Sequence, residues 1–255
     1  MSNKLSQFYI ENVFTCTTCT QAVMNPYLHH NQKHDTKTNM HLNRRKFLLA
    51  CLEQKTEIDL VFVGEAPGLD GCGYGGIAFT GEYNAIHDLG LDDYHQNQGA
   101  LQRERSADLI YGGLREFCRQ SNIPVSIAAR KIYLTNAVLC VPLQANGKSI
   151  TAPNKTTLHN CGVNLRTQLE IIRPRAVVTL GGNALSAMAS AFEFTYEDKL
   201  TNMVSRQRQQ KSPLISHTGF EIIPEIHPSP RNRVLGSLYS ELPSRLVNLY
   251  ATYIG

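Results

Sequence analysis

Four short apolar runs in the sequence are each followed by polar or glycine-rich residues that could form a ligand site. The first run leads into the segment 64–68 (GEAPG), the second contains Asn136, the third precedes the pair at 181–182 (GG), and the fourth ends before His227. If these runs are parallel strands, their carboxyl ends meet at one edge of a sheet, where open α/β proteins bind their ligands. The sequence therefore predicts one site assembled from four strand ends.

Three side chains in these segments suit the recognition of a planar, hydrogen-bonding ring. The amide of Asn136 offers an acceptor and two donors, which match the Watson–Crick edge of uracil or, after rotation, of cytosine. Phe79 could stack on such a ring, and the imidazole of His227 could donate to a developing oxyanion. Each has an ordinary alternative: a turn asparagine, a core phenylalanine or a structural histidine. Their convergence is what favours a site.

Backbone groups and positive charge could contribute to the same site. The glycine-rich stretch 64–82 can turn main-chain N–H groups of Gly64, Ala66 and Gly68 toward a ligand, although an ordinary strand-to-helix loop would look similar. Ser229 could cap a helix whose first N–H groups hold a phosphate, with Arg231 and Arg233 beside it. The alternative is a helix cap next to solvated charges. Further candidates for phosphate contacts, with the same alternative, are Arg103, Arg105, Arg206, Arg208 and Lys211.

The seven cysteines argue against a disulfide framework, because their number is odd and no secretion signal is visible, so metal ligation or plain burial must account for them. Cys16 and Cys19 have the two-residue gap of metal ligation, and Cys140 and Cys161 could complete a set of four. Zinc would use the same geometry, with His159 as a substitute ligand. The sequence leaves open whether iron–sulfur or zinc is bound.

Alternating strands and helices must position these residues. Strands are predicted over 59–63, 132–138, 176–180 and 221–226, and helices over 40–54, 107–120, 156–172, 183–192 and 234–253. Such alternation predicts right-handed βαβ crossovers. We therefore expect a three-layer α/β/α sandwich around a central four-stranded, mainly parallel sheet, in a single domain over 1–255. The polar segments 92–106 and 205–211 are expected to be surface insertions.

Composition excludes several classes of protein. The chain has 255 residues, 42% of them hydrophobic and 18% charged, which predicts a packed globule rather than a disordered chain. No apolar run approaches the roughly 18 residues of a membrane span, and the first residues lack a signal-peptide pattern. We therefore expect a cytoplasmic protein. The net charge of +4 permits a polyanionic partner without requiring one.

Together these motifs resemble the uracil-DNA glycosylase superfamily, and most of all its iron–sulfur class, family four. The resemblance rests on GEAPG at 64–68, Phe79 in GIAFTG, TNAVLCVP at 135–142 and HPSP at 227–230. It implies that Phe79 stacks on a base flipped out of DNA, that Asn136 reads its edge and that His227 stabilises the departing base. It also implies that Cys16, Cys19, Cys140 and Cys161 bind a [4Fe-4S] cluster and that the loop after His227 enters the duplex.

The implied activity is a monofunctional DNA glycosylase that hydrolyses an N-glycosidic bond and leaves an abasic site. Glu65 or Asp70 would orient the attacking water, and the sequence does not choose between them. By this resemblance, glycine within 71–76 replaces the family's usual acidic residue near the C5 edge of the base, so the pocket could admit a bulky C5 substituent. Uracil is the default substrate. The alternatives are a C5-modified cytosine of phage DNA, in antiviral defence, and a module that binds modified DNA without cleaving it.

Overall fold

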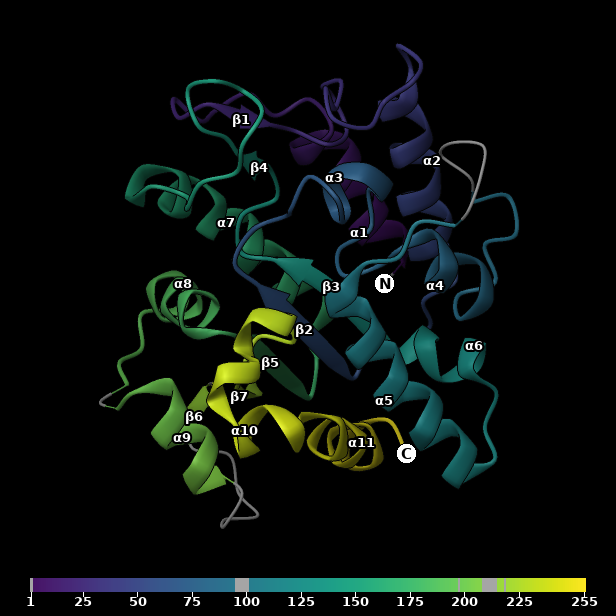
Figure 1. The fold of residues 1–255 in the computed structure, drawn as a ribbon, viewed down its shortest axis with the longest axis vertical. Coiled ribbons are helices and arrows are strands. Elements are labelled where there is room, and N and C mark those ends of the chain that lie inside the picture. Colours follow the sequence, from purple (N-terminus) through teal and green to yellow (C-terminus); the bar gives the residue numbers. More distant parts are fainter. Residues whose placement is uncertain (1, 95–100, 197, 208–214, 218) are drawn as a thin grey trace.

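Four parallel strands and one antiparallel strand form the main sheet of the computed structural model, which describes residues 2–94, 101–196, 198–207, 215–217 and 219–255. The strand order is β3-β2-β5-β7-β6 (Figure 1). The strands are β2 (Leu60–Gly64), β3 (Ile132–Asn136), β5 (Ala176–Leu180), β6 (Ile215–His217) and β7 (Phe220–Glu225). The four predicted strands are confirmed. The antiparallel edge strand β6 was not predicted from the sequence.

Helices cover both faces of the sheet, which explains why its central strands are apolar throughout (Figure 1). On one face, α5 (Arg105–Ser121) packs beside α11 (Leu242–Tyr253), and the Tyr250 ring of α11 lies 5.8 Å from that of Phe62 in β2. On the other face lie α7 (Lys155–Ile172) and α8 (Gly182–Phe192). The expected three-layer α/β/α sandwich is confirmed.

The remaining elements surround this sandwich, and all of them except the 14-residue α2 are short. They are α1 (Ser2–Phe8), η1 (Tyr9–Val13), β1 (Val23–Met24), α2 (Met40–Glu53), α3 (Cys72–Gly75), α4 (Glu82–His87), α6 (Val125–Ala128), η2 (Ala129–Lys131), β4 (Val141–Pro142), α9 (Leu200–Gln207), η3 (Pro230–Leu235) and α10 (Ser237–Ser240). The helix predicted over 234–253 is wrong as one element. Gly236 takes a φ of +57° there, and the chain forms η3, α10 and α11 in succession. None of the described helices is long and apolar enough to span a membrane.

One predicted surface insertion is partly an interior segment. Within 92–106, Tyr94 is fully buried, its ring lies 4.5 Å from that of Phe47, and its hydroxyl donates to the Gly75 carbonyl oxygen at 2.5 Å. Residues 102–104 pack against the backbone near Gly81. The expectation of a plain surface loop is therefore wrong for these residues. In the second insertion, residues 205–207 end α9, and 208–211 lie outside the described residues.

Candidate active site

The ends of β2 and β3 bring together the first three predicted site residues. Gly64 pairs with Asn136 across the parallel ladder. A Cβ atom on Gly64 would lie 2.5 Å from Asn136 Oδ1 and 2.5 Å from Phe79 Cζ, so glycine is the residue that lets the amide and the ring approach this strand end. Phe79 and Asn136 are almost completely buried. The predicted base-binding side chains thus pack together at one strand end.

His227 lies beside these residues, just after the end of β7. Its ring centroid lies 5.8 Å from that of Phe79, with the two planes tilted by 46°. At the end of β5, Gly181 has a φ of +94°, and a Cβ atom on it would contact His227 Cβ at 3.4 Å. All four parallel strand ends therefore meet, as the sequence predicted.

The environment of His227 favours a neutral imidazole with a defined tautomer. Burial lowers its pKa to about 4. The backbone N–H of Ser229 donates to Nδ1 at 3.1 Å, so the proton of the neutral ring must lie on Nε2. Asn232 Nδ2 also donates to the His227 carbonyl oxygen at 2.8 Å and holds the turn in place. His227 is thus a neutral hydrogen-bond donor at Nε2.

The two predicted water-orienting carboxylates differ in their surroundings. Glu65 Oε1 accepts a hydrogen bond from Asn183 Nδ2 at 2.9 Å, next to the start of α8. Asp70 is 64% exposed and pairs with Lys33 Nζ at 2.6 Å and His34 Nε2 at 2.5 Å. Partial burial raises the pKa of Asp70, but the hydrogen bonds from Lys33 and His34 outweigh this and lower it below its usual value. Asp70 is therefore an ion-paired surface carboxylate.

The space beside the glycine-rich loop is free at Gly68 and is occupied by another side chain at Gly71. Ala66 and Gly68 are half-buried, and a Cβ atom on Gly68 would meet no atom within 4 Å. A Cβ atom on Gly71 would instead lie 2.6 to 2.9 Å from the carboxyl atoms of Glu104. The expectation that glycine at 71–76 leaves this side of the pocket unguarded is therefore wrong at Gly71.

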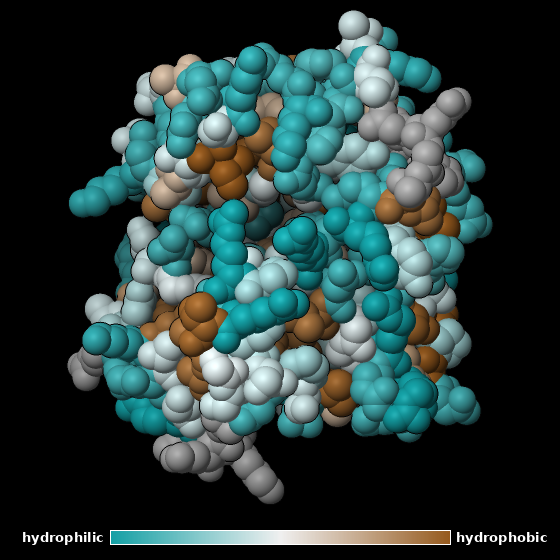
Figure 2. Space-filling view, in the orientation of Figure 1, coloured by the Kyte–Doolittle hydropathy of each residue, from teal (hydrophilic) through white to brown (hydrophobic). Residues whose placement is uncertain are grey.

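A cavity of about 890 Å³ runs from this loop to the turn after His227. Its lining includes Gly68, Asp70, Ser229 and Arg231, together with the cationic side chains Lys33, Arg103, Arg105 and Lys148. Figure 2 shows hydrophilic side chains around a hollow in the middle of the face seen in Figure 1. Several of the residues predicted to contact phosphate thus line one groove.

The other predicted cationic residues are distributed differently. Arg233 is exposed on η3, next to Val234, whose apolar side chain is 87% exposed. Arg206 pairs with Asp198 at 2.9 Å, which makes it a local ion-pair partner. Arg208 and Lys211 lie outside the described residues. Ser229 caps η3, since its Oγ accepts from the Arg231 N–H at 3.4 Å.

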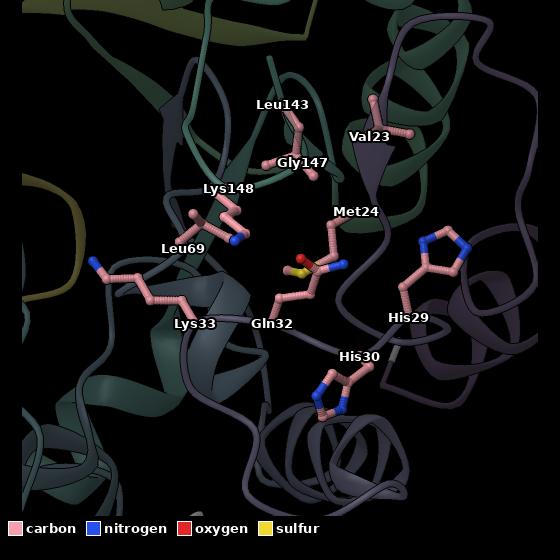
Figure 3. A pocket seen from close by; sticks show the side chains of 10 residues that line it. All are labelled: Val23, Met24, His29, His30, Gln32, Lys33, Leu69, Leu143, Gly147 and Lys148. Carbon is pink, nitrogen blue, oxygen red and sulfur yellow. The ribbon is translucent and has the colours of Figure 1, made fainter. Parts of the chain in front are cut away.

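A second cavity, of about 720 Å³, adjoins the first (Figure 3). Lys33, Leu69 and Lys148 line both, so two lysines stand between the cavities. Figure 3 shows Met24 and Gln32 extending toward the middle of this second cavity, with His29 and His30 at its side. The second cavity therefore extends from the two shared lysines toward the N-terminal segment that carries Val23 and Met24.

The four predicted cysteine ligands are gathered by the N-terminal segment. β1 pairs antiparallel with β4, which brings the loop bearing Cys16 and Cys19 to Cys140 at the start of β4 and to Cys161 on α7. Cys16, Cys19 and Cys140 all lie close enough to the Cys161 thiol to interact with it electrostatically. Burial raises the pKa of Cys161 to about 11. His159 is exposed on α7.

As the side chains stand, no group of three or more His, Cys, Asp or Glu residues in the described part of the chain could hold a single metal ion. The donor set is nevertheless all thiol, drawn from three separate segments. Four cysteines of this kind are the usual ligands of a [4Fe-4S] cluster, which is larger than one ion. An all-thiol set of four suits a [4Fe-4S] cluster and equally a structural zinc ion.

Comparison with known proteins decides the family. The profile of the uracil DNA glycosylase superfamily matches residues 52–247. The chain belongs to this superfamily. The uracil DNA glycosylase match spans β2 to α11 and so includes the four strand ends, whereas Cys16 and Cys19 lie before it.

Within this superfamily the chain is similar to curated enzymes of two types. It is 28% identical over 141 residues to a type-5 uracil-DNA glycosylase of Pyrobaculum aerophilum, covering 53% of this chain and 55% of that one. It is 28% identical over 160 residues to a type-4 enzyme of Archaeoglobus fulgidus (63% and 61% covered) and 27% identical over 194 residues to one of Thermotoga maritima (76% of each). The chain thus spans less than two thirds of the first two relatives.

A solved structure supports the fold over almost the whole chain. The crystal structure of wild-type Pedobacter heparinus SMUG2 superposes with a TM-score of 0.62 and 19% identity, covering 98% of this chain and 97% of that one. The uracil DNA glycosylase fold therefore includes the N-terminal segment as well as the sandwich.

Proposed function

We propose that this chain is a monofunctional DNA glycosylase that flips a pyrimidine, uracil by default, out of DNA and hydrolyses its N-glycosidic bond. The observation that carries the proposal is the meeting of Phe79, Asn136 and His227 around Gly64 at the strand ends. Membership in the superfamily and the uracil-DNA glycosylase names of the curated relatives support it.

The flipped base would be held by one ring and one amide. Phe79 provides a stacking face, and Asn136 provides a donor and an acceptor for the O4 and N3–H of uracil. Extruding the base costs about a few kcal/mol of unstacking and unpairing. Val234, exposed on η3 beside the groove, is an apolar side chain of the kind that wedges into a base stack and offsets this cost.

Bond cleavage leaves negative charge on the departing base, and His227 is placed to stabilise it. The neutral ring donates from Nε2, because Nδ1 already accepts from Ser229. A neutral donor in a buried site stabilises a developing oxyanion without first having to lose or gain a proton. Backbone N–H groups of the 64–68 loop would add to this stabilisation. Of the two predicted water-orienting carboxylates, we favour Glu65, because Asp70 is held at the surface by Lys33 and His34.

We further propose that Cys16, Cys19, Cys140 and Cys161 hold a [4Fe-4S] cluster. Four thiolates leave no iron with an open protein ligand position, so the cluster would be structural. It would tie the N-terminal segment, already joined through the β1–β4 ladder, to α7 and to the strand end that carries Asn136.

One observation favours a second substrate, a C5-modified cytosine such as those of phage DNA. The space beside Gly68 is open, and the cavity of about 890 Å³ begins there, so a bulky substituent on the base could extend into it. The amide of Asn136 can rotate to match cytosine. Such a substrate would assign the enzyme to defence rather than repair.

Excision assays on matched oligonucleotides test these proposals. Single- and double-stranded DNA carrying uracil, thymine or a 5-substituted cytosine is incubated with the anaerobically purified protein, and alkali then reveals abasic sites. Excision of uracil supports the first proposal, and excision of only the substituted cytosine supports the second. Base-dependent binding with no abasic product from any substrate would contradict both and indicate a binding module.

A further inference from the structure

Glu104 brings into the site a carboxyl group that the glycine-rich loop does not itself supply. It lies at the N-terminal boundary of α5, in the segment 92–106, and its carboxyl atoms occupy the space that a side chain at Gly71 would fill. The Thr80 backbone N–H lies close enough to the carboxyl group to lower its pKa, and Thr80 directly follows the stacking residue Phe79. Glu104 thus contacts both ends of the loop that forms the pocket wall.

One oxygen of this carboxyl group has no partner. Oε2 is buried and makes no hydrogen bond to any described residue. Leaving a buried acceptor unpaired is unfavourable, so this oxygen is available to a hydrogen-bond donor that enters the site. Glu104 also lines the same cavity as Gly68, Ser229 and Arg231, which is the path by which DNA would reach the pocket.

We propose that Glu104 is a residue of the reaction site whose free oxygen accepts a hydrogen bond from an O–H or N–H group in the occupied pocket. This inference rests on the proposed glycosylase function. Two donors have this chemistry: the attacking water, and an amino or hydroxyl group carried by the base. The first makes Glu104 a residue for hydrolysis of every substrate, whereas the second makes it a determinant of which base is accepted.

The charge state of Glu104 gives the proposal a pH signature. Burial raises its pKa to about 7, the nearby carboxylates of Asp70 and Asp108 act in the same direction, and the Thr80 N–H opposes them. The Cys72 thiol also faces it, and burial raises the pKa of that thiol to about 12, which keeps it neutral. An acceptor carboxylate therefore forms as the pH rises through about 7.

The test compares the full-length wild-type protein with Glu104→Gln, Glu104→Ala and a matched control. Glu104→Gln keeps the shape and an oxygen for Thr80 but places a neutral amide in the pocket. Glu116→Gln removes an acidic side chain from the same helix, where it is paired with Arg119 at the surface. Thermal unfolding of each variant checks that the fold is retained.

Two readouts separate the sources of the donor. The first is the single-turnover excision rate between pH 5.5 and 8.5 on uracil and 5-substituted cytosine DNA. The second is the affinity for the same duplexes with a 2′-fluoroarabino sugar, which resists cleavage. If the donor is water, Glu104→Gln lowers the excision rate of every substrate base by about 10²-fold and removes the increase of that rate near pH 7. The affinity for the uncleavable analogues is then unchanged. If the donor belongs to the base, analogue affinity falls about tenfold or more for that base alone.

The outcomes distinguish this inference from the function on which it rests. If both Glu104 variants show the excision rates, pH profile and analogue affinities of the wild-type protein, the role of Glu104 is overturned and the glycosylase proposal stands. A wild-type protein that excises no base, but whose base-dependent analogue affinity needs Glu104, would overturn the glycosylase proposal and retain Glu104. Loss of both activity and analogue affinity in Glu116→Gln as well would contradict a specific role.

Discussion

Gly64→Ala is the smallest change that should disable the site while leaving the fold in place. The added Cβ would lie 2.5 Å from Asn136 Oδ1 and from Phe79 Cζ, whereas ordinary contacts begin at 3.4 Å. Each group must therefore retreat by about 0.9 Å, or the strand must shift. Gly64 has no positive φ, so the backbone itself accepts alanine. The damage should be confined to the position of the amide and the ring.

The expected magnitudes follow from this displacement. Overpacking of this kind costs about 1–3 kcal/mol, and each kcal/mol lowers Tm by about 2–4 °C in a chain of this size. A misplacement of about 1 Å can cost about 10²-fold in rate. We therefore expect Gly64→Ala to fold with a modestly lowered Tm and to excise its base about 10²-fold more slowly in single turnover.

A matched glycine provides the control. Gly112 lies inside α5, and a Cβ atom on it would meet nothing within 4 Å, so Gly112→Ala should keep full activity and gain about 0.5–1 kcal/mol from helix propensity. Wild-type excision by a folded Gly64→Ala protein would refute the reasoning, because it would show that Asn136 and Phe79 need not occupy their observed positions.

The remaining predictions concern four other positions or pairs. His227→Gln should slow excision about 10²–10³-fold in single-turnover assays. The pKa of His227 is about 4 in the folded protein and 6.5 ordinarily, so the unfolded chain takes up a proton at a higher pH than the folded protein does. The free energy of unfolding of the wild-type protein should therefore fall relative to that of His227→Gln as the pH drops from about 6.5 to about 4, as measured by urea titrations. Asn136→Asp should reduce excision of uracil about tenfold or more, since the amide donor to O4 is lost, with binding to abasic DNA as the control. Cys140→Ser should lower the iron content and Tm of anaerobically purified protein; unchanged iron would exclude this thiol as a ligand. Replacing both Arg231 and Arg233 by alanine should reduce the slope of log K against log salt by about 2 in anisotropy titrations, and an unchanged slope would exclude phosphate contacts.

The strand ends could be predicted from the sequence because their signals are local. Each central strand is a short β-branched run buried on both faces, and the residue types that follow it are turn formers or polar groups. Parallel pairing then requires those ends to meet, so Gly64 lies opposite Asn136 as expected. The sequence also suggested that Cys16, Cys19, Cys140 and Cys161 belong together, and the structure brings these four thiols near one another; their role as ligands stays a prediction.

Other features depend on tertiary contacts that composition does not reveal. The segment 92–106 reads as polar, yet Tyr94 is buried against Phe47, and Glu104 fills the space above Gly71. The only local signal was the coincidence of a glycine-rich loop and an acidic residue at a predicted helix start. Asp70 was a reasonable candidate for the site until its ion pairs with Lys33 and His34 became visible.

Gly236 shows the limit of helix prediction near the site. The apolar spacing over 234–253 is typical of a helix, but the positive φ at Gly236 divides the segment. Val234 therefore lies in the separate helix η3, where its side chain is exposed. That division follows from the turn after His227, where Ser229 and Asn232 fix the backbone. The irregular structure here is what presents an apolar side chain beside the cationic groove.

The most direct test of the central claim is identification of the free base released in a single turnover. Wild-type protein and the Asn136→Ala and His227→Ala variants are mixed in excess with duplex DNA carrying uracil or a 5-substituted cytosine, and the small-molecule fraction is analysed by mass spectrometry. We predict one free pyrimidine per abasic site from the wild-type protein and little from either variant. Base release that is equally fast in both variants, or DNA binding by the wild-type protein with no base released from either substrate, would contradict the account.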